Sequence, residues 1–130
     1  MNESRKWMAF AHEDLVVAEA ALKEGIHNQT CFHAQQGVEK ALKGFLRHRQ
    51  RSVPQVHGLR ELLAACQKFD GSFGMLRETC VKLERYYIPT RYPDALPGMA
   101  SEEGLPTRQD AEEAVALLRQ ALSWVEAKLT

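Results

Sequence analysis

The chain has 130 residues, the size of one domain with one hydrophobic core. Its apolar fraction of 45% and charged fraction of 26% are ordinary for a globular protein and exclude a disordered or fibrous chain. Seventeen Lys and Arg balance seventeen Asp and Glu, so no overall field attracts nucleic acid or an anionic membrane. No apolar run approaches the length of a membrane span, and we predict a cytoplasmic protein.

The first half of the chain predicts two long helices and a short one. Ser4 is a suitable cap for a first helix, in which apolar residues recur every three or four positions and which Gly25 ends. A second helix begins at Asn28 and ends near Arg49, and its apolar residues form one continuous arc. Leucines at three- and four-residue spacing predict a short third helix over residues 59–69.

The second half predicts two more helices. Apolar residues from Phe73 to Tyr87 step by three and four along a fourth helix. A last helix begins at "TRQD", where Thr107 and Asp110 resemble a capping box, and its heptad-like spacing favours an antiparallel neighbour. The predicted fold class is therefore all-α: an antiparallel bundle of about five helices, an up-and-down four-helix core plus a short helix, in one domain over residues 1–130.

A long connection at about residues 88–105 separates the last two helices. Loops beyond about 12 to 15 residues in compact domains are usually functional or disordered. We expect the first part, "YYIPTRYPDA", to be ordered against the bundle, and the second part, "LPGMASEEG", to behave as a linker.

The three cysteines, Cys31, Cys66 and Cys80, lie on apolar phases of the predicted helices. Their odd number and the lack of paired metal-ligand spacing favour reduced, packed thiols over a disulfide framework or a zinc site. The sequence predicts no metal site.

The second helix carries an unusual polar side. Within "CFHAQQGVEKALKGFLRHR", residues 31–49, one narrow stripe of the helical wheel holds His33, Gly37, Lys40 and Gly44. Glycine costs about 1 kcal/mol relative to Ala inside a helix, so we expect something to pack or bind on this side. Two interpretations stay open. The glycines admit a neighbouring helix beside solvated side chains, or they open a slot for "TRYPDA" or for the same helix of a second subunit.

In the second interpretation, His33 and Lys40 face Asp94 or a phosphate. A slot flanked by Lys and Arg suits an anion, because both supply charge-assisted hydrogen-bond donors. The candidate ligand-binding residues are His33, Gln36, Lys40, Lys43, Arg91, Tyr92 and Asp94, and the candidate interface or close-packing residues are Gly37 and Gly44. His57, which precedes the third helix, is expected to bond a helix end or a loop carbonyl.

Three segments, "CFHAQQGVEKALKGFL", "VHGLRELL" and "LERYYIPTRYPDAL", resemble the HEPN domain family, and the resemblance spans residues 1–130. It implies a bundle of about five helices that usually dimerises. Such domains are often encoded beside a minimal nucleotidyltransferase, in a two-component or toxin-antitoxin arrangement. Some members are metal-independent ribonucleases, in which an Arg and a His with four to six residues between them begin a late helix and meet across the dimer.

The sequence departs from this ribonuclease pattern. His57 is the last of five histidines, so the late-helix Arg and His pair cannot form. Arg51 with His57 and Arg5 with His12 match the bare spacing, but about one accidental match is expected in such a chain, so neither is informative. We predict no catalytic residue.

Three functional hypotheses follow. The first is a non-catalytic HEPN binding module, a homodimer that acts with a minimal nucleotidyltransferase, requires no cofactor and holds a nucleotide or other anion beside Lys40, Lys43 and Arg91. The second is a HEPN-type metal-independent ribonuclease, toxin-like, for which RNA would be the substrate. The third is a structural dimerisation scaffold.

Overall fold

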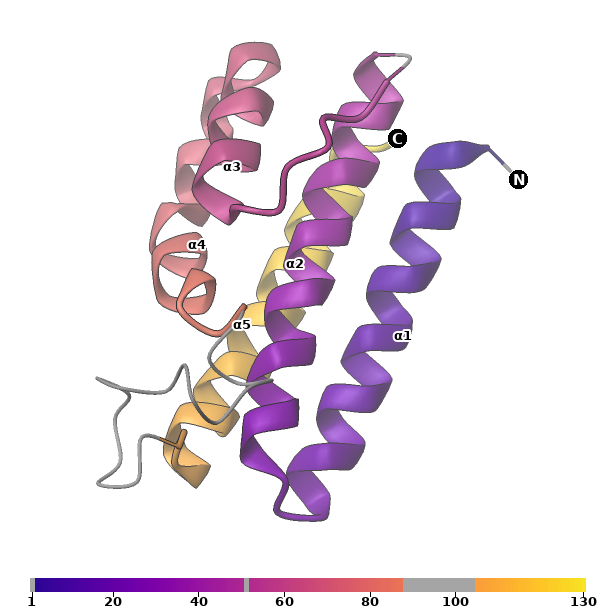
Figure 1. Ribbon diagram of the computed structural model, residues 1–130. Coiled ribbons are helices and arrows are strands. Elements are labelled where there is room, and N and C mark those ends of the chain that lie inside the picture. The colour runs from indigo at the N-terminus through magenta and orange to yellow at the C-terminus, as the bar shows by residue number, and fades with distance from the viewer. Residues whose placement is uncertain (1, 51, 88–104) are drawn as a thin grey trace.

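The computed structural model describes residues 2–50, 52–87 and 105–130, which form a helical bundle (Figure 1). No described residue lies in a strand, so the all-α prediction is confirmed. The elements in chain order are α1 (Glu3–Lys23), α2 (His27–Arg49), α3 (Leu59–Phe69), the 3₁₀ helix η1 (Gly71–Leu76), α4 (Arg77–Glu84) and α5 (Arg108–Ala127). None of these helices is long and apolar enough to span a bilayer.

Helix α2 is the centre of the bundle. It lies side by side with α1 and antiparallel to it, and it contacts α5, α3 and α4 on its other sides (Figure 1). The α1–α2 turn closes at Gly25, whose φ of 76° is a conformation that other residues rarely adopt. The sides of α2 therefore meet different neighbours, and little of its length faces water.

Helix ends follow the predicted signals with two differences. The N-cap of α1 is Asn2, which accepts a hydrogen bond from the Arg5 backbone, so the prediction of Ser4 as the cap was wrong. The predicted fourth helix is a 3₁₀ turn followed by α4, because the Asp70 side chain accepts from the Ser72 backbone and starts the turn early. The Thr107–Asp110 capping box of α5 is present with both reciprocal hydrogen bonds, as predicted.

Aromatic side chains join three elements in the core. Phe73 of η1 packs against Phe45 of α2 with ring centroids 4.2 Å apart, and its edge meets Trp124 of α5 at 4.8 Å. Such pairs add about 0.5–1.5 kcal/mol beyond the area they bury. They fix η1 against the α2–α5 pair.

The three cysteines are free and fully buried, one each on α2, α3 and α4. Burial is the main cause that raises the pKa of each thiol, Cys31, Cys66 and Cys80, to about 12.

The two glycines of the α2 stripe pack against helices of the same chain. A Cβ on Gly37 would lie 2.6 Å from Leu118 Cδ1 of α5 and 3.4 Å from the Ala11 carbonyl oxygen of α1. A Cβ on Gly44 would lie 3.0 Å from Trp7 Cβ, also on α1. This side of α2 matches the first of the two open interpretations, in which the glycines admit a neighbouring helix, and "TRYPDA" lies outside the described residues. Helices α1 and α5 fill this side, because the missing side chains let α2 approach both.

The predicted long loop lies outside the described residues apart from Leu105, and so do Arg91, Tyr92 and Asp94.

Candidate functional site

A buried carboxylate on α1 holds a histidine and a lysine of α2. Asp14, with 7% of its side chain exposed, accepts a hydrogen bond from His33 Nδ1 at 2.9 Å and from Lys40 Nζ at 2.6 Å. His33 and Lys40 are seven residues apart, so they lie two turns apart on one face of α2. Each binds a different oxygen of the carboxylate. Asp14 therefore fixes the direction of both donors, which remain about a quarter exposed.

A second buried carboxylate lies on α2 itself. Glu39 Oε2 accepts from Lys43 Nζ at 2.9 Å and from His57 Nδ1 at 2.8 Å. The side chains of Glu39 and Lys43 are 7% and 8% exposed, whereas that of His57 is 57% exposed. Within this cluster Lys43 is therefore enclosed, whereas His57 is the accessible member.

Two glutamines extend the Glu39 cluster. Gln36 Nε2 donates to Gln35 Oε1 at 2.8 Å and approaches Glu39 Oε1 at 3.5 Å. Gln35 is fully buried, and its Nε2 has no hydrogen-bond partner among the described residues. An unmatched buried donor costs about 1–3 kcal/mol. The polar side of α2 is therefore an internal network more than a solvated surface.

His57 reaches Glu39 because the segment after α2 runs back along that helix (Figure 1). Its ring stacks on Tyr87 at 5.8 Å with an interplanar angle of 10°. The side chain also lines a hollow of about 240 Å³ with Trp7, Lys43 and residues 53–55. The expected bond to a helix end or loop carbonyl was wrong, because a carboxylate lies within reach of Nδ1.

Charge is balanced within this site. Two carboxylates face two ammonium groups, so with neutral histidines the clusters carry no net charge. Lys43 is enclosed with Glu39, and only Lys40, His33 and His57 keep exposed surface. Because Nδ1 of each histidine binds a carboxylate, Nε2 is the ring nitrogen left for a ligand.

The structure brings His33, Gln36, Lys40 and Lys43 to one side of α2, and it divides them between the two carboxylate clusters. The sequence did not indicate Asp14, Gln35 or Glu39 as site residues. It also did not indicate that His57 lies beside Glu39. Asp14 had a usable signal, because it falls between Ala11 and Ala18 in the buried phase of α1.

Metal binding has no support in residues 2–50, 52–87 and 105–130. No group of three or more His, Cys, Asp or Glu side chains in these ranges is placed to hold an ion.

The family profile described as "HEPN domain" matches residues 4–128. The structure is similar to the crystal structure of TT1696 from Thermus thermophilus, with 40% sequence identity and a TM-score of 0.86 over 99% of this chain and 100% of that one. It is also similar to ST0689, an archaeal HEPN homologue, with 28% identity and a TM-score of 0.78 over 100% of both chains. No protein of curated function matches the chain significantly.

Proposed function

Because the chain belongs to the HEPN domain family, we propose that it is a non-catalytic binding module. In this proposal it acts as a homodimer with a minimal nucleotidyltransferase and holds a nucleotide or similar anion on the exposed side of α2.

The observation that carries this proposal is the fixed orientation of one ammonium donor, Lys40, and of two imidazoles, whose Nε2 donates to an anion when the ring is protonated. His33 and Lys40 are held by buried Asp14, and His57 is held by buried Glu39. Donors that are already oriented lose little conformational entropy when a ligand binds, which favours affinity. A phosphate group accepts well from such charge-assisted donors. Lys43 contributes by holding Glu39, because its own ammonium is enclosed.

The lack of net positive charge limits the affinity of this site for an anion. The clusters offer one exposed ammonium, that of Lys40, and the whole chain has no net charge to attract an anion from a distance. Binding is therefore expected to be weak and to fall further as salt screens the contact.

Lys40→Met is expected to weaken ATP or GTP binding about tenfold or more, because a hydrogen bond to a charged group is worth about 1.5–3 kcal/mol. Isothermal titration calorimetry on wild type and variant measures this. Lys82→Met is a matched control, because Lys82 also binds carboxylates, Glu78 and Glu113, but lies on α4. Equal binding by wild type and Lys40→Met would remove the proposed site.

The homodimer in this proposal is supported by exposed apolar side chains in the C-terminal half of α1 and in the turn after it. Val16, Val17 and Ile26 are 65%, 43% and 48% exposed. Large exposed apolar side chains in one region of a surface are typical of an interaction site.

Val16→Glu is expected to convert a dimer into a monomer, because it places an unpaired charge in an apolar contact. Sedimentation velocity at several protein concentrations measures the change. Val81→Glu is the control, since Val81 of α4 is also exposed, at 49%. A wild type that sediments as a monomer throughout would contradict the homodimer.

One observation favours the ribonuclease as a second candidate. The Glu39–His57 contact orients an imidazole with Nε2 outward, which is the arrangement of a carboxylate-supported general base. We nevertheless expect pure protein to leave single-stranded RNA intact. RNA degradation that is lost in His57→Ala but kept in the control variant His12→Ala would establish the ribonuclease. A dimer that neither binds nucleotide nor cleaves RNA would establish the scaffold.

A further inference from the structure

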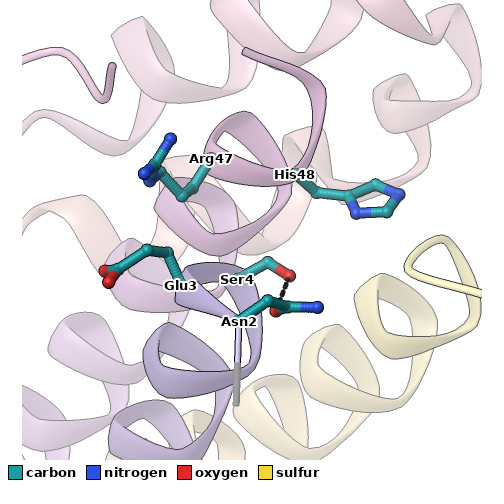
Figure 2. A pocket seen from close by; sticks show the side chains of 5 residues that line it. All are labelled: Asn2, Glu3, Ser4, Arg47 and His48. Atoms are coloured by element: carbon teal, nitrogen blue, oxygen red, sulfur yellow. Dashed lines mark hydrogen bonds between the residues drawn. The ribbon is translucent and has the colours of Figure 1, made fainter. Parts of the chain in front are cut away.

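Two adjoining hollows follow the first turns of α1 and the last turn of α2. The larger, of about 460 Å³, is lined by Asn2, Glu3, Ser4, Arg47 and His48. Figure 2 shows Arg47 and Glu3 on one side of it and His48 on the other, with Asn2 and Ser4 between them. The smaller, of about 200 Å³, is lined by Glu3, Lys6, Trp7 and Phe10. Because they share Glu3, we describe them together as the α1 groove.

One wall of the α1 groove is formed by two aromatic residues, Trp7 and Phe10. Phe10 is 55% exposed, more than any other Phe, Trp or Tyr in the described part of the chain. Glu3, Lys6, Trp7 and Phe10 follow the spacing of one helix face, whereas Met8, which fills the core, points away from that face. A large exposed ring next to a hollow is typical of an anchor for a partner.

The same end of the bundle is basic, although the chain as a whole is neutral. Residues 2–6 and 47–50 contain Arg5, Lys6, Arg47 and Arg49 against Glu3, four positive charges to one negative, a net of +3 with His48 neutral. The Glu3 carboxylate already accepts from Lys6 Nζ at 3.4 Å. A partner of negative charge would complement this end.

We propose that the α1 groove docks an acidic segment of a partner protein, which inserts an aromatic or large aliphatic side chain beside Trp7 and Phe10. The groove uses neither His33 nor Lys40, so this proposal does not rest on the nucleotide site. A twofold contact through the same surface would bring two basic ends together, which disfavours a second copy of the chain. Nucleic acid is disfavoured because its affinity comes mainly from neutralising several phosphates, and this end has four cations, of which Lys6 already pairs with Glu3.

The test uses a short acidic peptide of Asp and Glu with a central Leu-Phe pair. Titration into ¹⁵N-labelled full-length protein is expected to shift the indole signal of Trp7. The signal of Trp124, packed against Phe73 in the core, serves as an internal reference. The same peptide with Ser-Ser in place of Leu-Phe is expected to bind about tenfold more weakly, because the apolar anchor is lost.

Two variants assign the binding to the groove. Phe10→Ser and Lys6→Glu are each expected to weaken the peptide about tenfold, whereas Met75→Ser, a change at a 73% exposed site on η1, leaves affinity unchanged. Unchanged affinity in Phe10→Ser would overturn the proposal, as would a peptide that does not shift Trp7. Tighter binding of an oligouridylate than of the peptide would assign the surface to RNA instead. Loss of self-association in Phe10→Ser would assign it to a second copy.

Discussion

Glu39→Ala is expected to lower the free energy of unfolding by about 3–5 kcal/mol, because it leaves the Lys43 ammonium buried without a counter-charge. His57 loses its partner in the same change. Urea unfolding followed by far-UV circular dichroism gives the difference. The loss is a large fraction of a typical domain stability of about 5–15 kcal/mol.

Glu112→Ala is the matched control for this result. Glu112 and Arg108 form a pair at the same four-residue spacing, but both side chains are more than half exposed. Exposed pairs of this kind contribute about 0.3–0.5 kcal/mol. In addition, Glu39→Leu combined with Lys43→Met should recover most of the loss, since apolar replacement of a whole buried pair is often neutral. A loss in Glu39→Ala no larger than in Glu112→Ala would show that Lys43 escapes to water.

Replacing both Gly37 and Gly44 with Leu is expected to cost about 2–6 kcal/mol, at about 1–3 kcal/mol for each overpacked site. The side chains would collide with Leu118 of α5 and with Trp7 of α1. The two effects should be close to additive, because the sites are two helical turns apart and have different neighbours. Urea unfolding measures the loss in free energy of unfolding, and differential scanning calorimetry measures the accompanying fall in melting temperature.

Gly71→Leu is the control for the glycine variant. A Cβ at Gly71 would meet no atom within 4 Å, so the change adds the same side chain in open space. A double variant as stable as Gly71→Leu would mean that α1 and α5 do not press against α2 at these positions.

The fold was predictable from the sequence because local signals and hydrophobic spacing agreed. The predicted third helix over residues 59–69 coincides with α3, and the Thr107–Asp110 box starts α5 where expected. The fourth element was misjudged, because Phe73 and Leu76 are three residues apart and fit both an α-helix and a 3₁₀ turn. Periodicity alone cannot separate the two over so short a segment.

Only the part of the site that lies on α2 was predictable from the sequence. Helical spacing places His33 and Lys40 together, but their shared partner Asp14 is on another helix, and its facing depends on how α1 lies against α2. His57 was harder, because it belongs to a segment without periodicity, and its contact with Glu39 depends on the path of that segment.

The buried cysteines have a consequence for how the bundle can be studied. A thiol reagent attacks the thiolate, and with pKa values of about 12 in the closed bundle almost none is present at neutral pH. Labelling must therefore wait until a helix moves away from the core. Because Cys31, Cys66 and Cys80 sit on three different helices, the order in which they are labelled reports which helix opens first.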